Sequence, residues 1–153
     1  QKRKPFRCIA DFFANDRLDV IAFTLASAGL KISDYERSLY DKGEFTKYYQ
    51  VHGLGVELAE ALAEVLHKQI RLDLDIVPKE GHTLNDVQMK QYVGCRYSPG
   101  YAACPDLAMN RDIFDLLKPE EFGIELSETF QMHPEQTTCA IVVTHKEANY
   151  YNI

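Results

Sequence analysis

One short segment of the chain, residues 94–105, combines a fixed cation, aromatic rings and turn residues more closely than any other segment. Proline presets φ at one central position of a turn, and glycine permits positive φ at the next. The pair Pro99-Gly100 therefore predicts a tight reversal with Arg96 and Tyr101 at its two ends, facing a common space. Arg96 could pair with a carboxylate or a phosphate, and Tyr101 could orient a small ligand through its ring and hydroxyl.

Small residues in the same segment, Gly100, Ala102 and Ala103, would let a ligand approach the backbone closely. A structural interpretation remains open, in which the segment is only a hairpin and Arg96 pairs with a surface acid. On spacing alone this interpretation is favoured, because arginines next to turns are common and exposed ion pairs contribute little.

The composition is that of an ordinary globular domain. The 153 residues are 46% hydrophobic and 26% charged, which predicts one domain with its own core. A net charge of −6 argues against nucleic acid as a partner, and no apolar run is long enough to span a bilayer, so no membrane partner is expected. The four cysteines contain no CxxC pair, which argues against a metal site and favours free thiols in a reducing cytoplasm.

The first part of the chain predicts one strand followed by helices. The expected elements are a strand over 6–13, a helix over about 18–28 capped by Asp16 or Asp19, and a helix from the capping-box pattern at 33–36 to Gly43. The second of these is ambiguous, because residues 20–23 also have the character of a strand.

The clearest helix is expected over residues 56–74. Its apolar side chains at helical spacing predict a buried face made of Ala59, Leu62, Ala63, Leu66 and Ile70. Charged side chains on the other side, Glu57, Glu60, Glu64, Lys68 and Arg71, are expected to be solvated. Glu64 and His67 have the Glu-x-x-His spacing of carboxylate-bridged metal sites, but no second copy exists, so a solvated face is favoured here as well.

The remaining elements complete an α+β order. They are a short helix over 83–91, a helix over 106–117 that buries Ile113, Leu116 and Leu117, a turn or a single helical turn over 119–124, and strands over 126–132, 139–144 and 150–153. Short connections between the last strands predict an antiparallel meander. Strand, helices and then strands indicate an α+β fold and not an alternating βαβ fold.

Several segments together resemble one family. Residues 96–106 resemble the RxxxGYxACP signature of the reactivation, or S-adenosylmethionine-binding activation, domain of cobalamin (vitamin B12)-dependent methionine synthase. Residues 126–134 are similar to the LTExFxMxP strand of that domain, residues 58–67 to its LAEAxAExxH helix, residues 10–12 to its early strand and residues 141–151 to its closing hairpin. The resemblance covers nearly the whole chain, in order.

The resemblance implies an α+β fold with a bent antiparallel β-sheet flanked by helices. It implies one domain, 1–153, without the N-terminal segment and the C-terminal end of the family's domain. The implied function is to present S-adenosylmethionine for reductive methylation of cob(II)alamin, as part of a cytoplasmic multidomain methyltransferase of methionine biosynthesis. The implied partners are the cobalamin-binding domain of the same enzyme and a flavodoxin-type reductant.

The resemblance also implies which residues contact S-adenosylmethionine. They are Arg96, Tyr101, Tyr150 and Tyr151, with Ser98, Gly100 and Ala102 contributing near the amino-acid end of the ligand. Arg96 would pair with the methionyl carboxylate, and tyrosine faces would hold the adenine and the sulfonium. No catalytic acid or base is expected, because a methyl group moves from sulfur to the metal of the cofactor.

The chain departs from the family pattern at a few positions. Ala102 replaces a usual proline, Pro99 replaces a frequent phenylalanine, and Lys90 stands where some members carry an acid. An aspartate that holds the ligand's amino group in the family belongs to a segment upstream of this chain.

Other classes of function remain as alternatives. One is an interaction module that docks the cobalamin domain and flavodoxin without productive ligand binding. Another is a metal-dependent enzyme that uses Glu60, Glu64 and His67, with His133 or His145. A Rossmann-type methyltransferase is disfavoured, because no glycine-rich loop follows a first strand.

Overall fold

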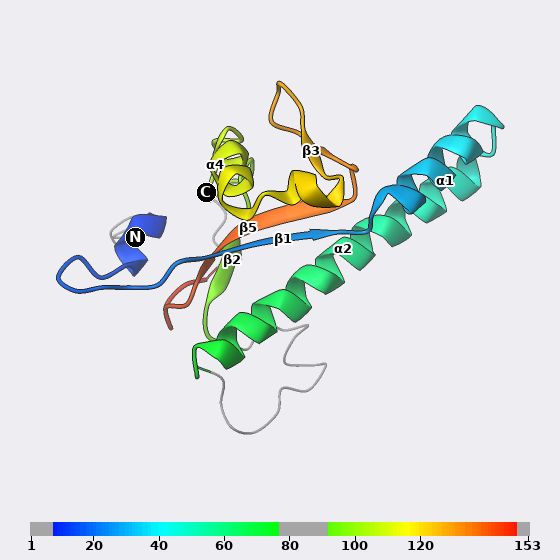
Figure 1. The fold of residues 1–153 in the computed structure, drawn as a ribbon. Helices are drawn as coiled ribbons and strands as arrows, with labels where there is room; N and C mark the ends of the chain where they lie inside the picture. The colour runs from blue at the N-terminus through cyan, green and yellow to red at the C-terminus, as the bar shows by residue number, and fades with distance from the viewer. Residues whose placement is uncertain (1–7, 77–91, 150–153) are drawn as a thin grey trace, which may run out of the picture.

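The computed structural model describes residues 8–76 and 92–149. A three-stranded antiparallel sheet lies at its centre, in the order β1-β5-β2. The long helix α2 crosses one face of this sheet, and α4 lies over the other (Figure 1). The helices and strands are η1 (Ile9–Phe12), β1 (Ala22–Ser27), α1 (Leu30–Asp41), α2 (Phe45–Asp73), β2 (Cys95–Tyr97), α4 (Met109–Leu117), η2 (Pro119–Phe122), β3 (Glu125–Leu126), β4 (Met132–His133) and β5 (Thr137–Val143). The predicted α+β class with an antiparallel sheet is confirmed.

The predicted meander is wrong, because β5 is the central strand. It pairs antiparallel with β1 from Thr137 to Val142 and with β2 from Ile141 to Val143. Most of β5 is buried. This strongly apolar strand therefore lies in the middle of the sheet, where both of its faces are covered. Its odd-numbered residues 139, 141 and 143 share a core with Ile113 of α4. Because successive side chains of a strand point to opposite faces of the sheet, its even-numbered residues point toward α2.

Two predictions for the first thirty residues are wrong. Residues 9–12 form a 3-10 turn and not a strand, since the Asp11 carboxylate accepts a hydrogen bond from the Cys8 N–H at 2.7 Å and closes the chain locally. The helix expected over 18–28 is instead β1, which agrees with the strand character of residues 20–23. Pairing with β5 outweighs the helical spacing of its apolar residues.

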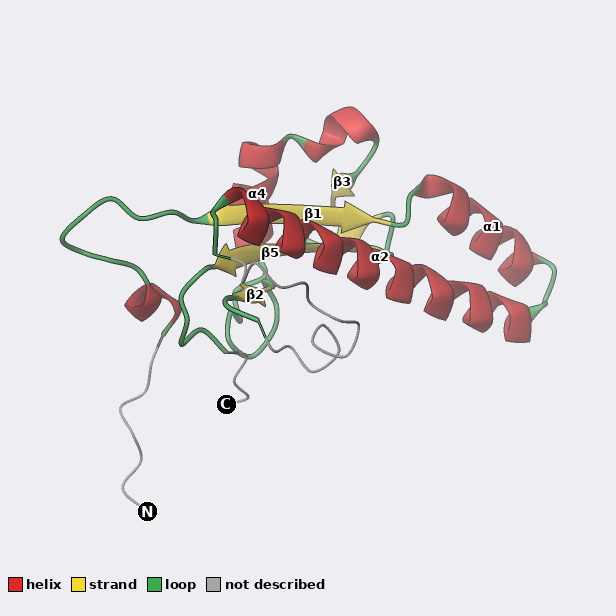
Figure 2. Ribbon diagram, turned by 90° about the horizontal axis from the view of Figure 1, so that it is seen from below, coloured by secondary structure: helices red, strands yellow, loops and turns green. Residues whose placement is uncertain are grey.

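The helix α1 begins at Leu30 with Gly29 as its N-cap, three residues before the predicted capping box. Ser33 does not cap it, because its hydroxyl donates to Gln136 Oε1 at 2.9 Å. The helix α2 begins at Phe45, eleven residues earlier than predicted, and continues through Gly53 and Gly55. Together α1 and α2 form a hairpin that extends past the end of the sheet (Figure 2).

The buried face of α2 differs from the predicted one. Its buried residues repeat every fourth position: Gly55, Ala59, Ala63, His67 and Arg71. Leu62 and Leu66 remain 40% and 38% exposed, although both were expected in the core. Small residues along the buried stripe allow the helix backbone to approach the sheet closely.

The C-terminal half is closer to the prediction. The turn over 119–124 is confirmed as η2, and α4 buries Ile113 but leaves Leu116 62% exposed. The strand expected over 126–132 is divided into β3 and β4, which pair with each other around Phe130, a residue with φ of 62°. The helix over 83–91 and the strand over 150–153 lie outside the described residues.

The four cysteines are free, as predicted. Cys104 and Cys139 belong to the core between the sheet and α4. Burial raises the pKa of the Cys139 thiol to about 12, and this thiol donates to Asn110 Oδ1 at 3.0 Å. These two thiols are therefore packing residues with little nucleophilic character.

Candidate functional site

The Pro99-Gly100 turn predicted from the sequence is present and follows directly after β2. Gly100 has φ of 88°, and its N–H donates to the Cys104 carbonyl at 2.8 Å. The Cys104 N–H in turn donates to the Tyr101 carbonyl at 2.9 Å. These backbone bonds fix Tyr101, whose side chain is 61% exposed, beside the end of β2.

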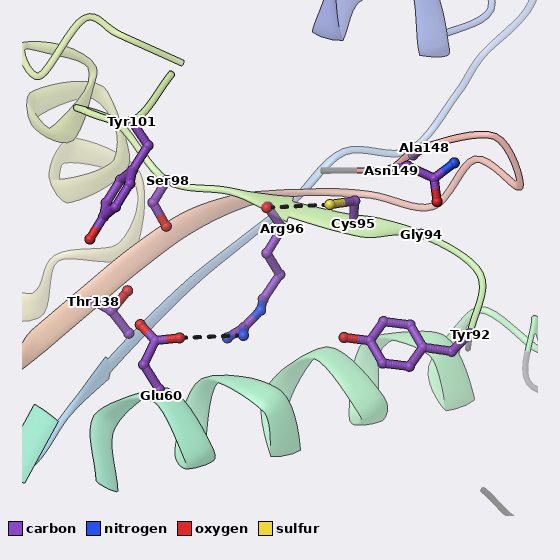
Figure 3. Close-up of a pocket in the computed structure, with 10 residues that line it drawn as sticks. All are labelled: Glu60, Tyr92, Gly94, Cys95, Arg96, Ser98, Tyr101, Thr138, Ala148 and Asn149. Atoms are coloured by element: carbon purple, nitrogen blue, oxygen red, sulfur yellow. Dashed lines mark hydrogen bonds and ion pairs between the residues drawn. The ribbon is translucent and has the colours of Figure 1, made fainter. Parts of the chain in front are cut away.

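A cavity of about 460 Å³ lies between α2 and the turn (Figure 3). It is lined by Glu60, Tyr92, Gly94, Cys95, Arg96, Ser98, Tyr101, Thr138, Ala148 and Asn149. The structure thus brings Arg96, Ser98 and Tyr101 to one cavity, as the turn predicted. Gly100 and Ala102 do not line it, and Tyr150 and Tyr151 lie outside the described residues.

Arg96 crosses the cavity from the sheet toward α2 (Figure 3). It pairs with Val142 in the sheet and so lies on the face that α2 covers. Its Nη2 is 3.5 Å from Glu60 Oε2 and 3.4 Å from Glu64 Oε2. Both distances exceed the 2.7–2.9 Å or so of a tight charge-assisted hydrogen bond. Arg96 does pair with acids, as the structural interpretation expected, through two long hydrogen bonds that cross the cavity.

Beneath Arg96 lies a polar cluster formed by the buried His67 and Arg71 and the partly buried Glu64 and Tyr92. The Tyr92 hydroxyl donates to Glu64 Oε2 at 2.9 Å, and the His67 ring meets the edge of the Tyr92 ring at 5.2 Å between centroids. Burial, and then the charges of Arg71 and Arg96, lower the pKa of His67 to about 3, so this ring is neutral. Burial, and then the Glu64 carboxylate, raise the pKa of Tyr92 above its ordinary value.

The sequence-based expectation for this face of α2 is therefore wrong. His67 is fully buried, Arg71 is 1% exposed and Glu64 is partly buried, whereas all were expected in solvent. The signal that could have located them is the four-residue spacing of Ala59, Ala63, His67 and Arg71. No group of three or more His, Cys, Asp or Glu side chains is arranged to hold a metal ion within residues 8–76 and 92–149.

Gly94 joins this cluster to the sheet at the start of β2. Its φ is 93°, and a Cβ atom at this position would lie 2.7 Å from the Val143 carbonyl oxygen and 3.4 Å from His67 Nε2. Only glycine therefore lets the chain pass between the histidine and the central strand.

The wall opposite α2 is held by Tyr97, the last residue of β2. Its hydroxyl donates to the Asn149 carbonyl at 2.9 Å, and both Ala148 and Asn149 line the cavity. Tyr97 itself is fully buried in the core on the α4 side of the sheet. The residue next to Arg96 thus fixes the segment that precedes Tyr150.

A second cavity of about 240 Å³ adjoins the first. The two share Glu60, Ser98, Tyr101 and Thr138 as lining residues. Together they form a site with a cationic group, carboxylates and an exposed aromatic face. Such a site suits a small molecule that carries both a carboxylate and a positive charge.

None of the helices in the described part of the chain is both long enough and apolar enough to cross a membrane. Comparison with known proteins assigns a family to the whole chain: residues 1–153 match the family model described as vitamin B12 dependent methionine synthase, activation domain.

Methionine synthase of Mycobacterium tuberculosis (strain ATCC 25618 / H37Rv) is 40% identical over 166 aligned residues, which cover 100% of this chain and 14% of that protein. Methionine synthase of Mycobacterium leprae (strain TN) is 39% identical, again over 100% of this chain and 14% of that protein. Among solved structures, the MetH reactivation domain bound to AdoHcy superposes with a TM-score of 0.78 and 28% identity, over 86% of this chain and 41% of that one. The chain thus spans about a seventh of the length of the two methionine synthases.

Proposed function

The chain belongs to the family of vitamin B12 dependent methionine synthase activation domains, and from this premise we propose that it binds S-adenosylmethionine and presents it for the reductive methylation of cobalamin. The relative with a solved structure carries AdoHcy, the product of methyl transfer from that ligand. The observation that carries the proposal is the convergence of Arg96 and Tyr101 on one cavity that Glu60 also lines.

The residues of the cavity fit the chemistry of S-adenosylmethionine. The ligand has a carboxylate for Arg96, a flat adenine for the exposed ring of Tyr101, and cationic ammonium and sulfonium groups that Glu60 would attract. The 460 Å³ of the main cavity lies within the range of about 300–1,000 Å³ that small-molecule sites occupy. Bound there, S-adenosylmethionine supplies an electrophilic methyl group, and the role of this chain is to orient it.

We extend the proposed site to the other residues that the family resemblance implies. Ser98 and the backbone at Gly100 and Ala102 would bond the amino-acid end of the ligand. Tyr150 and Tyr151 directly follow Asn149, a residue of the cavity wall, and would extend that wall. No residue of the chain is assigned a catalytic role.

The larger setting is part of the proposal as well. We propose that residues 1–153 are one piece of a cytoplasmic, multidomain 5-methyltetrahydrofolate–homocysteine methyltransferase. Cobalamin would be bound by a neighbouring domain, and a flavodoxin-type protein would supply the electron. The match to about 14% of each curated methionine synthase supports this arrangement.

The proposal is tested by calorimetric titration of S-adenosylmethionine into the chain and into a form extended upstream. We expect Arg96→Ala to lose on the order of 1.5–3 kcal/mol of binding free energy, as for a hydrogen bond to a charged group. Arg111→Ala is the matched control, because Arg111 is exposed on α4 and does not line the cavity. Loss of binding in both variants alike would contradict the assignment of Arg96.

The titration also distinguishes the proposed ligand-binding function from the alternative function, that of an interaction module. If the chain docks a cobalamin-carrying domain but neither form binds S-adenosylmethionine, it is an interaction module and the ligand site proposed above is wrong. Binding by the extended form alone would retain the site and show that the upstream segment completes it.

A further inference from the structure

Arg71 is a buried arginine beneath the cavity to which no role has been assigned so far. Its side chain is 1% exposed, and its three guanidinium nitrogens have no hydrogen bond within the described residues. The guanidinium carbon lies 3.9 Å from the centroid of the Tyr92 ring, and Nη2 lies 3.9 Å from Glu64 Oε1. Burying a cation costs free energy unless neighbouring groups compensate its charge. Tyr92 and Glu64 are the neighbours that do so here, and we therefore ask what their arrangement around Arg71 achieves.

Glu64 connects this buried arginine to the arginine of the cavity. Oε1 faces Arg71, whereas Oε2 accepts the Tyr92 hydroxyl at 2.9 Å and lies 3.4 Å from Arg96 Nη2. Each oxygen of the carboxylate therefore faces a different arginine. Tyr92 contacts both sides, since its ring lies under Arg71 and its hydroxyl bonds to Glu64.

Among the described residues, two cations and two anions face one another in this region. Arg71 and Arg96 face Glu60 and Glu64, and the adjacent His67 is neutral. If Arg71 were absent, Arg96 would be the one lysine or arginine among the described residues that forms an ion pair with Glu64. A partly buried carboxylate would then draw that guanidinium into a closed pair, because the Tyr92 hydroxyl that also bonds to it carries no charge to neutralise it.

We propose that Arg71 is a positioning residue: by sharing Glu64, it leaves the Arg96 guanidinium available for the carboxylate of the ligand. The inference rests on the proposed function, because it deepens the role of Arg96 in binding S-adenosylmethionine. The long hydrogen bond of 3.4 Å from Arg96 Nη2 to Glu64 Oε2 is the state that this sharing maintains. An arginine suits the position better than a lysine, since its flat guanidinium can stack on Tyr92 and reach Glu64 at the same time.

The test compares two ligands that differ in one group, S-adenosylmethionine and decarboxylated S-adenosylmethionine. The ratio of their dissociation constants reports what the carboxylate contributes. We expect the chain to prefer S-adenosylmethionine, and we expect Arg71→Met to reduce this preference by about tenfold, through weaker binding of the carboxylate-bearing ligand. The measurement is calorimetry on the form of the chain that binds in the titration described above.

The ratio separates positioning from a purely structural role. A damaged fold would weaken both ligands equally and leave the ratio unchanged, and this result would overturn the inference. If neither the unsubstituted chain nor its upstream-extended form binds either ligand, the proposed function fails and the inference with it. If the unsubstituted chain binds with a clear preference that Arg71→Met retains, the inference alone fails.

A second comparison, made in a protein that already carries Glu64→Gln, tests the inference even if Arg71→Met alone misfolds. In Glu64→Gln the charge that Arg71 compensates is gone, so adding Arg71→Met should leave the ratio unchanged. A further fall of the ratio in the double variant would contradict the inference, because Arg71 would then act without Glu64. Tyr92→Phe keeps the stacked ring and removes the hydroxyl, and we expect it to reduce the ratio less than Arg71→Met does.

Discussion

At the residue scale, the roles of Gly94 and His67 depend on the atoms that lie within a few ångströms of them. Gly94 has positive φ and lies against the backbone of the central strand. His67 lies against Gly94, fully enclosed, and both of its ring nitrogens are without a hydrogen bond inside the described part of the chain. Neither residue touches the ligand in our proposal, but both support the floor of the cavity. Each has a consequence for stability that can be measured.

Gly94→Ala should destabilise the protein by about 2–5 kcal/mol, from the left-handed backbone and from contact with the Val143 carbonyl. Gly43→Ala is the control, because Gly43 also has positive φ, 72°, but has no atom within 4 Å of the added Cβ. It should cost only about 1–2 kcal/mol. Urea denaturation measures both changes, and equal losses would show that the close approach at Gly94 is unimportant.

His67 should make stability depend on pH. Its pKa is about 3 in the folded chain and near 6.5 as a free side chain. Below pH 6.5 the unfolded chain therefore binds a proton that the folded chain does not, and unfolding becomes easier as pH falls toward 3. Between pH 7 and pH 5 this residue alone should remove about 2 kcal/mol of stability.

The measurement is urea denaturation of the protein and of His67→Leu at both pH values. The variant lacks the titrating ring, so it should lose about 2 kcal/mol less than the unsubstituted protein over this interval. Parallel losses would mean that His67 is protonated in the folded state as easily as in the unfolded one.

At the scale of the element, α2 shows why its buried face follows small residues and not leucines. The helix carries two candidate faces, one with Leu62 and Leu66 and one with Ala59 and Ala63. The second face lies against the sheet, because alanine and glycine let the helix approach closely enough for Glu64 and Arg71 to reach under β2. The leucine side remains partly exposed, with Leu66 lining a groove beside Phe122.

Two neighbouring glycines of α2 should respond in opposite directions to alanine. Gly53 has open space around it, so Gly53→Ala should stabilise the protein by about 0.5–1 kcal/mol through helix propensity. Gly55 is different, because an added Cβ would lie 2.9 Å from Gln136 Cγ and 3.2 Å from Ile32 Cγ2. Hydrogen bonds hold Gln136 in place, so Gly55→Ala should destabilise the protein by about 1–3 kcal/mol. Shifts of the urea midpoint in one common direction would contradict this account of the two faces.

At the scale of the whole molecule, the hairpin of α1 and α2 extends beyond the sheet and is joined to it at Gln136 (Figure 2). The Gln136 side chain is 1% exposed; its Nε2 donates to Glu36 Oε2 at 2.6 Å, and its Oε1 accepts from Ser33 at 2.9 Å. The backbone carbonyl of the same residue accepts from the Ala28 N–H at 2.9 Å. One residue thus joins the start of β5 to the first turns of α1.

Gln136→Ala should loosen the hairpin more than the sheet. It removes the hydrogen bond to the buried Glu36 carboxylate, a loss of about 2–4 kcal/mol. Hydrogen exchange followed by mass spectrometry should then show faster exchange in α1 than before, with β1 and β5 much less affected. Gln69→Ala is the control, since Gln69 bonds Asp73 on the exposed side of α2. Equal acceleration in the sheet would show that the hairpin and the sheet unfold as one unit.

The sequence by itself determined the features that depend on neighbours along the chain. The Pro99-Gly100 turn, the approach of Arg96 and Tyr101 to one cavity, the turn that begins at Pro119 and the α+β class were all predicted correctly. Such features depend on φ preferences and on side chains a few positions apart, so they are encoded locally. The family followed from segments of the same kind.

Only the tertiary structure decided which faces meet. It placed β5 between β1 and β2, converted the expected helix at residues 22–27 into a strand, and buried His67 and Arg71 beneath the cavity. The partners of Arg96 come from α2, more than thirty residues away, so no local pattern marks them. These choices depend on how closely backbones can approach and on which buried charges compensate one another, and both quantities exist only once distant segments are packed together.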